Sequence, residues 1–229
     1  MKRRIPLQPL ALLGLLLAAC SADPNHVVIL NARAPGQNCD FSDDTKYVTD
    51  GSLDLRPYLE GGVTLATTQY RQIFSWENNL QRIQTSVNGQ VLDNGTGNDF
   101  IADSIVYEYQ YTDPSITLAT ETANLRAVIT AGAQTTNNSV GADLIQPAAS
   151  AAIANSTAID TKAQTLLVTF QIFGKLVAGN SLHTNKVTFP VSVVRSSTTP
   201  LDCGALGLVP NGGPCGIPGR DQYVSCTKP

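Results

Sequence analysis

The strongest constraint on the fold lies in residues 165–194, where apolar and polar side chains alternate along two long runs. A period of two places all the apolar side chains of a strand on one face. Between the runs, Ala178-Gly179-Asn180-Ser181 contains the residue types that a tight reversal needs. We therefore predict a long antiparallel hairpin, with Pro190 at an edge or a bulge because proline cannot donate to a ladder. The side chains expected on the buried face are Leu166, Val168, Phe170, Ile172, Val187, Phe189, Val191 and Val193.

Shorter segments with the same alternation predict further strands. They are residues 26–30, the stretch with Leu53 and Leu55, residues 70–77 with Tyr70, Gln72, Phe74 and Trp76 on one face, and residues 105–111. Residues 132–143 are expected to form a polar loop, and Ala-rich residues 144–162, with Pro147, one or two short helical turns. Several strands without a long amphipathic helix predict an all-β chain, folded as an immunoglobulin-like antiparallel β-sandwich.

Composition agrees with a protein that has a core and is exported. Hydrophobic residues make up 42% of the 229 residues, which is enough for a core. Charged residues make up 14%, against roughly 25% in ordinary soluble domains. The formal net charge is −3 and no basic stripe is present, so nucleic acid is not expected as a partner. With two His and one Met, the chain offers little material for a His-built metal or proton-transfer site, and no cofactor is expected.

The first twenty residues have the order of a targeting segment. Lys2, Arg3 and Arg4 form a positive region, and residues 10–19 form an apolar run. Ten helical residues span ~15 Å, about half of a bilayer core, so this run is too short to be a transmembrane helix. An ordinary secretory signal, cut near an A-x-A-like site, is one interpretation of this order.

The run ends in Leu17-Ala18-Ala19-Cys20, which resembles the lipobox of bacterial lipoproteins. The resemblance implies that residues 1–19 are a signal peptide, that Cys20 carries the lipid, and that residues 20–38 are the lipid-anchored N-terminal segment. Two or three acyl chains hold a protein on a membrane stably, where one chain is marginal. Ser21 stands where Asp would retain such a lipoprotein in the inner membrane, so the resemblance implies the outer membrane, on its periplasmic or surface face.

The other four cysteines, Cys39, Cys203, Cys215 and Cys226, are the disulfide candidates. An even number of cysteines in an exported chain predicts two disulfides, whereas a metal site would need closer ligand pairs, and free thiols are the other alternative. Any complete pairing joins Cys39 to the C-terminal segment, with a preference for Cys39–Cys203 and Cys215–Cys226. We expect residues 39–200 to form the sandwich and residues 201–229 to form a Cys-, Gly- and Pro-rich irregular tail, pinned to it by disulfides.

Three short stretches of the mature chain look like lipoproteins common in myxobacteria and their relatives. They are Gly51-Ser-Leu-Asp-Leu55 followed by Tyr70 and Trp76-Glu-Asn-Asn-Leu80, then the hairpin end at residues 185–193, then residues 214–221 together with Cys226. That family often carries more cysteines near the hairpin end and in the tail than this chain does. The resemblance implies no activity, because none is assigned to the family.

Candidate chemical sites are few, and each has a structural alternative. His26 and His183 are far apart in sequence, without a motif around either, and His183 is expected to be a solvated strand-end residue. Acidic and amide side chains on two loops could hold Ca²⁺, but their spacing fails the EF-hand pattern and favours plain turns. These side chains are Asp93, Asn94, Asn98, Asp99 and Asp103 on one loop, and Asp40, Asp43 and Asp44 on the other.

Four aromatic side chains could instead form a platform for a sugar or a peptide. They are Trp76, Tyr107, Tyr109 and Tyr111, and their alternation with other strand residues favours ordinary sheet packing. We identify no catalytic residue and no metal ligand. The sequence predicts a non-catalytic envelope protein, a structural or protein-interaction module, or alternatively a glycan- or peptide-binding module.

Overall fold

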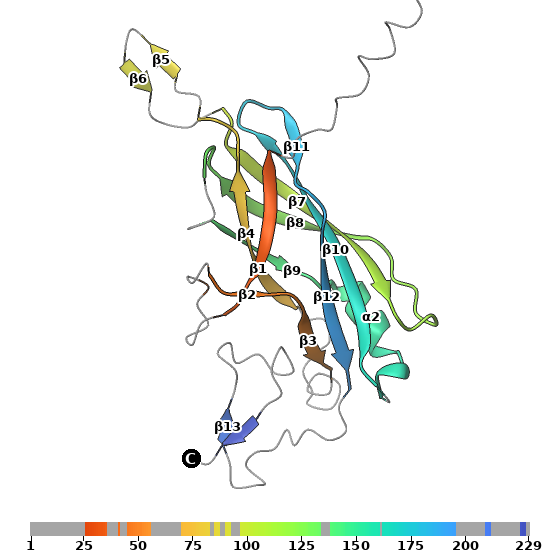
Figure 1. The fold of residues 1–229 in the computed structure, drawn as a ribbon. Helices are drawn as coiled ribbons and strands as arrows, with labels where there is room; N and C mark the ends of the chain where they lie inside the picture. Colours follow the sequence, from red (N-terminus) through yellow and green to blue (C-terminus); the bar gives the residue numbers. More distant parts are fainter. Residues whose placement is uncertain are drawn as a thin grey trace, which may run out of the picture.

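A computed structural model describes residues 26–35, 41, 45–55, 70–82, 85–87, 90–92, 97–133, 138–160, 162–195, 209–211 and 225–227. Most of these residues belong to two β-sheets that pack face to face (Figure 1). The first sheet, sheet A, has the strand order β2 (Tyr47–Val48), β1 (Val27–Arg33), β4 (Arg71–Asn78) and β9 (Ser139–Asp143). Its four strands are paired antiparallel.

The second sheet, sheet B, contains the predicted hairpin at its centre. Its order is β3 (Gly51–Asp54), β12 (Val187–Val194), β10 (Gln164–Leu176), β7 (Phe100–Tyr111) and β8 (Glu121–Ile129). The short strand β11 (Ser181–His183) pairs with the end of β10 that lies beyond β12. Gly179 has a φ of +98° in the turn between β10 and β11, so the expected reversal is confirmed at the expected residue.

The remaining elements are short. The helix α2 (Pro147–Ala154) has Pro147 in its first turn and is followed by a 3₁₀ turn, η3 (Ala158–Asp160), so the predicted helical turns are confirmed. Two further antiparallel strand pairs are β5 (Thr85–Val87) with β6 (Gln90–Leu92), and β13 (Val209–Asn211) with β14 (Ser225–Thr227). Among the residues described, no helix has the length and apolar character that crossing a bilayer requires.

The core lies between the two sheets and is filled from their facing strands. Phe170 of β10 and Phe189 of β12 are both buried, as the alternation predicts. The ring of Phe74 in β4 meets Phe170 with centroids 4.9 Å apart and Phe189 with centroids 5.9 Å apart. Since β4 belongs to sheet A and the other two strands to sheet B, these rings join the two sheets across the core.

Three details differ from the sequence-based expectations. Residues 139–143, expected in a polar loop, form β9, in which Val140 and Ala142 are buried against the core. Strand β8 was not predicted, because its inward side chains are mostly small and only Ile129 is fully buried. The pairing of β3 with β12 is parallel, so the sheets are not wholly antiparallel. Only Thr49 and Asp50 separate β2 from β3, so the chain passes directly from the edge of one sheet to the edge of the other.

Pro190 lies at a strand edge, as expected, because the hydrogen-bond ladder between β12 and β3 does not yet include it. It lies opposite Leu167 of β10, and the parallel ladder with β3 starts one residue later, at Val191.

Several predictions fall outside the described residues. These are the signal peptide, Cys20, Cys39, Cys203 and Cys215, and the structure describes Cys226 only as a backbone position of β14. Within the expected N-terminal segment 20–38, β1 is a strand of sheet A.

Candidate functional site

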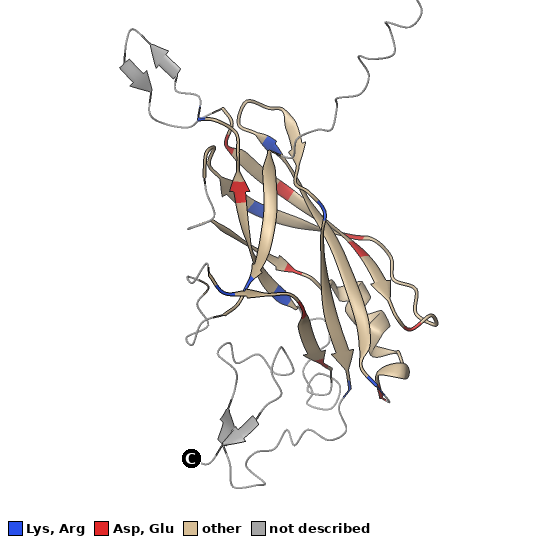
Figure 2. Cartoon of the chain, viewed as in Figure 1, with Lys and Arg blue, Asp and Glu red and all other residues tan. Residues whose placement is uncertain are grey.

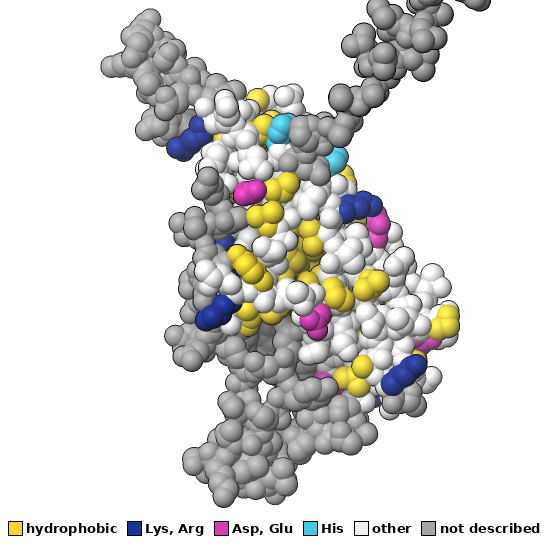
Figure 3. All heavy atoms as spheres, in the orientation of Figure 1, with side chains coloured by type: hydrophobic (Ala, Val, Ile, Leu, Met, Phe, Trp, Pro, Cys, Tyr) yellow, Lys and Arg dark blue, Asp and Glu magenta, His cyan; other side chains and the backbone are white. Residues whose placement is uncertain are grey.

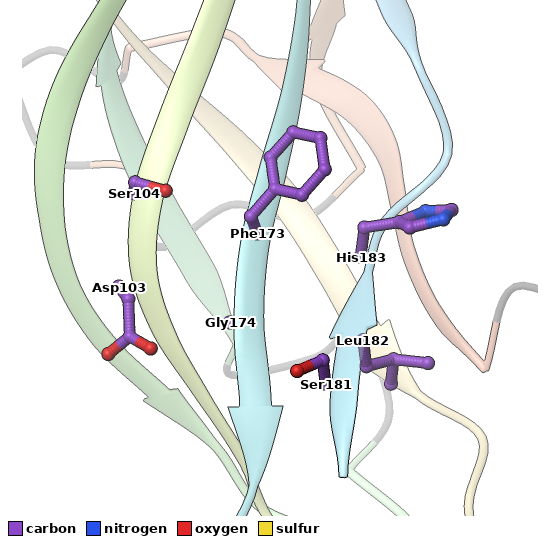
Figure 4. Close-up of a pocket in the computed structure, with 7 residues that line it drawn as sticks. All are labelled: Asp103, Ser104, Phe173, Gly174, Ser181, Leu182 and His183. Atoms are coloured by element: carbon purple, nitrogen blue, oxygen red, sulfur yellow. The ribbon is translucent and has the colours of Figure 1, made fainter.

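A shallow hollow of about 290 Å³ opens on the outer face of sheet B, where β7, β10 and β11 lie side by side (Figure 4). Figure 4 shows that the three strands each contribute side chains to it. The lining residues are Asp103 and Ser104 from β7, Phe173 and Gly174 from β10, and Ser181, Leu182 and His183 from β11. The hollow therefore combines one aromatic ring with a carboxylate, two hydroxyls and an imidazole.

A β-bulge explains why two neighbouring polar residues of β7 line the same hollow. Ser104 pairs with Phe173 of β10, but Ala102 pairs with the next residue, Gly174, so Asp103 is one extra residue in β7. The alternation of buried positions changes phase there, with Ala102 and Ile105 both buried. A bulge of this kind can direct two successive side chains to the same face of the sheet, whereas in a regular strand they point to opposite faces. Asp103 and Ser104 consequently both lie on the outer face of the sheet.

Gly174 makes this bulge sterically possible. A Cβ atom at this position would lie 2.1 Å from the carbonyl oxygen of Ile101 and 2.9 Å from the Cα of Ala102. Both contacts are with backbone atoms of β7, which cannot move aside as a flexible side chain would. Only glycine allows β7 and β10 to approach so closely at the floor of the hollow.

Phe173 stands at the centre of a row of side chains that crosses the three strands. It pairs with Ser104 on β7 and with His183 on β11. Its ring lies 5.7 Å from the His183 ring, centroid to centroid, at an interplanar angle of 55°. Although the core takes the other phenylalanines of β10 and β12, Phe173 is 36% exposed. A large aromatic ring is thus presented to solvent among polar groups.

His183 is oriented by polar groups beside it. Its Nδ1 lies 3.0 Å from Nε2 of Gln171 and 3.1 Å from the carbonyl oxygen of Thr184. Gln171 also donates to that carbonyl at 2.6 Å, and the buried hydroxyl of Thr184 accepts from the backbone N–H of Ile172 at 3.1 Å. One edge of the imidazole is therefore directed at the protein, and His183 is an exposed residue at the end of β11, as predicted.

The adjacent part of the outer face differs from the hollow, since its polar side chains pair across strands. Lys186 and Glu108 form an ion pair at 2.7 Å, and the hydroxyls of Thr169 and Thr188 lie 2.8 Å apart. In such cross-strand pairs each polar group is the partner of the other, and on an exposed sheet surface they contribute little to stability. In the hollow, by contrast, a carboxylate and two hydroxyls surround an exposed aromatic ring.

The geometry of the hollow suits binding better than proton transfer. Asp103 and His183 lie on the two strands that flank β10, and neighbouring strands are about 4.8 Å apart. Figure 4 shows the His183 ring directed away from Asp103. A general base must come within hydrogen-bond reach of the group that it serves, so these two residues do not form a catalytic pair. Within the described residues, no group of three or more His, Cys, Asp or Glu side chains could hold a metal ion.

The proposed calcium ligands that the structure describes have other uses. Asp99 accepts a hydrogen bond from the backbone N–H of Ala131 at 2.8 Å, and Asn98 donates to the carbonyl of Gln81 at 2.9 Å. Asp103 lines the hollow, four residues further on. These contacts agree with the turn interpretation for Asn98 and Asp99. Asp40, Asp43, Asp44, Asp93 and Asn94 lie outside the described residues.

The four aromatic residues considered as a platform do not form one. Trp76 and Tyr107 are buried, and Tyr109 and Tyr111 are partly buried against the core. The rings of Tyr107 and Tyr109 stack with centroids 6.3 Å apart, and burial raises the pKa of both hydroxyls above its ordinary value. The expectation of sheet packing is confirmed. The exposed aromatic residues are others, Tyr47 of β2 in sheet A and Phe173 on the outer face of sheet B.

A second polar cluster lies where β7 ends, around the buried carboxylate of Asp113. One oxygen accepts from the hydroxyl of Ser156 at 2.5 Å, and the other accepts from the backbone N–H and the hydroxyl of Ser115 at 3.0 and 2.7 Å. These hydrogen bonds hold the pKa of Asp113 below its ordinary value, and the bond from Ser156 makes the largest contribution. The cluster joins the loop after β7 to the turn after α2, which is a structural role.

The surface elsewhere carries few charges and an apolar band. Figure 2 shows Lys, Arg, Asp and Glu scattered over both sheets, with the two signs mixed. Figure 3 shows hydrophobic side chains along the middle of one face, over β1 and β12. Leu30 of β1, which is 39% exposed, is one of the large apolar residues at the surface. Over the described part of the surface, this distribution gives no strong electrostatic preference for a charged polymer.

Comparison of the chain with protein-family models, with curated proteins and with solved structures finds no match in any of the three. The hollow itself was not predicted from the sequence. An aromatic residue on the polar face of a strand, directly followed by a glycine, is the signal that could have pointed to it.

Proposed function

We propose that the protein is a lipid-anchored cell-envelope protein that acts as a non-catalytic interaction module. The observation that carries this proposal is the exposed ring of Phe173, set among Asp103, Ser104, Ser181 and His183 with no catalytic pairing between them. Exposed aromatic side chains surrounded by polar groups are typical of the centres of binding surfaces. The partner in this proposal is another envelope protein or a glycan.

A photo-crosslinking amino acid placed at position 173 in living cells tests the proposal. We expect a discrete crosslinked product from this position. The matched control is Val128 on β8, which is on the same outer face of sheet B and is 62% exposed. Equal products from positions 173 and 128, or none from either, would show that the hollow does not form a specific interaction.

The membrane tether in this proposal is Cys20, modified by acyl chains after removal of residues 1–19, with the outer membrane as the destination. The support is the order of charged residues, apolar run and lipobox-like Leu17-Ala18-Ala19-Cys20. In a Cys20→Ser variant we expect the protein to move from the membrane fraction to soluble or uncleaved material. Mature wild-type protein that partitions into water without detergent would contradict the tether.

The proposed fold type is immunoglobulin-like, and the strand orders support it. The run β12-β10-β7-β8 in sheet B corresponds to the G-F-C-C′ order of a variable-type domain, and β1-β4-β9 in sheet A corresponds to A-B-E. Antibody domains place their inter-sheet disulfide between strands B and F. The corresponding strands here, β4 and β10, are joined by the contact between Phe74 and Phe170. In this proposal the disulfides instead hold the C-terminal tail, through Cys39, Cys203, Cys215 and Cys226.

A glycan- or peptide-binding module is the second candidate function. The particular observation that favours it is the composition of the hollow, which presents a ring for stacking and several groups able to bind hydroxyls. Direct binding of a small ligand to the isolated protein separates this candidate from a purely protein-directed module.

A further inference from the structure

We infer that the hollow around Phe173 binds one pyranose ring of a neutral saccharide. The inference rests on the proposed function, because it names the ligand class of the same surface. Cavities that bind small ligands are typically roughly 300–1,000 Å³. The hollow, at about 290 Å³, lies just below that range, so it suits a single sugar unit of a longer chain that continues into solvent.

The Phe173 ring provides the apolar part of such a site. The face of an aromatic ring carries negative quadrupole charge, and the C–H groups on one side of a sugar ring carry partial positive charge. One side of the Phe173 ring is supported by His183, with ring centroids 5.7 Å apart. The support reduces the freedom that the ring would lose on binding, which lowers the entropic cost of forming the complex.

The polar residues around the ring provide hydrogen bonds for sugar hydroxyls. The carboxylate of Asp103 only accepts, whereas the hydroxyls of Ser104 and Ser181 both donate and accept. A sugar hydroxyl is itself both a donor and an acceptor, so it can satisfy each of these groups. All three side chains lie on the solvent-facing side of the sheet, as Figure 4 shows. The positions of Asp103 and Ser104 follow from the bulge at Asp103, which places two polar residues in succession on one face.

A peptide that adds to a sheet binds at an edge strand, through unpaired backbone groups. Among the described strands, β11 pairs only with β10, so such a peptide would lie along β11, beside the Phe173 ring. The ring itself stands on β10, which is paired to β7 on one side and to β11 on the other, so a ligand that stacks on the ring binds through side chains. An anionic ligand is disfavoured, because the carboxylate of Asp103 would repel it. A neutral sugar agrees with both observations.

The test uses the full lipidated chain, purified in a zwitterionic detergent that contains no sugar. Maltotriose, cellotriose and triacetylchitotriose are each examined by saturation-transfer NMR and by calorimetric titration. We expect at least one to bind, with the strongest saturation on the C–H protons of one ring. Phe173→Ala should weaken its binding roughly tenfold, the scale of loss on truncating a central aromatic contact. Phe173→Trp should retain binding, and Asp103→Asn should weaken it.

The matched control is Val128→Ala, which removes exposed apolar surface from the same sheet face outside the hollow and should leave binding unchanged. Unfolding midpoints measured on the same samples separate a loss of binding from a loss of fold. Absence of binding by all three saccharides, or equal binding by wild type and Phe173→Ala, would overturn the inference. If the crosslinker at position 173 captures a protein while no saccharide binds, the interaction module stands and the saccharide site is wrong.

Discussion

The side-chain amide of Asn185 binds both backbone polar atoms of Ile29. The N–H of Ile29 donates to Oδ1 of Asn185 at 2.7 Å, and Nδ2 of Asn185 donates to the carbonyl oxygen of Ile29 at 3.0 Å. Ile29 lies in β1 of sheet A, at a bulge in the ladder with β4, whereas Asn185 lies between β11 and β12 of sheet B. The amide group thus takes the place of a strand residue and connects the edges of the two sheets.

Replacing Asn185 by alanine should lower the free energy of unfolding by about 1–3 kcal/mol, because two buried backbone groups of Ile29 lose their partners. Asn185→Asp should also be destabilising, since a carboxylate oxygen would face the Ile29 carbonyl. Denaturant unfolding gives the free energies. Asn124→Ala, at an exposed position of β8, is the control, and an equal loss in both alanine variants would mean that the Asn185 amide contributes nothing specific.

Phe170 and Phe173 test the two faces of β10 with the same substitution. Phe170 is buried against Phe74, so Phe170→Ala should cost ~3–5 kcal/mol in unfolding free energy. Phe173 faces solvent, and its replacement by alanine should cost less than ~1 kcal/mol. Thermal or denaturant unfolding measures both. Similar losses in the two variants would show that the faces of the strand are wrongly assigned.

Gly174→Ala should be destabilising by about 1–3 kcal/mol or more, because the new Cβ would meet the Ile101 carbonyl oxygen. Gly97→Ala is the control, since a Cβ there would make an ordinary contact of 3.5 Å with the Cβ of Ala178. Unfolding midpoints of the two variants give the comparison. If Gly174→Ala is as stable as wild type, the close approach of β7 and β10 is not present in solution.

Acid should weaken the fold through Asp113. Its pKa in the folded state is held below the value of about 3.9 found in an unfolded chain. The stability from this carboxylate is therefore present above that value and is lost as the pH falls through the folded pKa. Ser156→Ala removes the leading cause of the shift and should flatten the acid side of the stability curve, measured by unfolding from about pH 7 to about pH 3. Ser104→Ala on the outer face should leave the curve unchanged.

Cys39 should be recovered in a disulfide with one of Cys203, Cys215 or Cys226 when the oxidised protein is mapped by non-reducing peptide analysis. Closing such a long loop lowers the entropy of the unfolded chain, a contribution of ~5 kcal/mol in the chain-entropy model. Reduction should therefore lower the unfolding midpoint. A Cys39 peptide found free, or as an intermolecular dimer, would disprove the predicted pairing.

The alternation of residue types was sufficient to predict the main strands. In residues 165–194 and 70–77 the side-chain period of two is set by the backbone alone, so apolar residues at alternate positions identify the buried face without any knowledge of the partner strand. Phe170, Phe189 and Trp76 were placed correctly for this reason. Turn chemistry is equally local, which is why the reversal at Gly179 was predictable.

Strands β8 and β9 were harder to predict, because their apolar side chains are small and are interrupted by polar ones. β9 is stabilised as a strand by its pairing with β4, and a contact between residues distant in sequence leaves no local pattern. The parallel pairing of β3 with β12 has the same origin, since it depends on how the chain crosses between sheets.

The sequence by itself determined the class of fold, the buried faces of its longest strands and the turn between β10 and β11. Only the tertiary structure decided the candidate site and the junction between the sheets. Asp103, Phe173 and His183 come together because a bulge shifts the pairing of β7 with β10 and because β11 pairs with the other side of β10. Asn185 meets Ile29 because two sheets pack against each other. Register and packing are relationships between distant segments, and a local period of two specifies which face a side chain takes but not which residue it will lie beside.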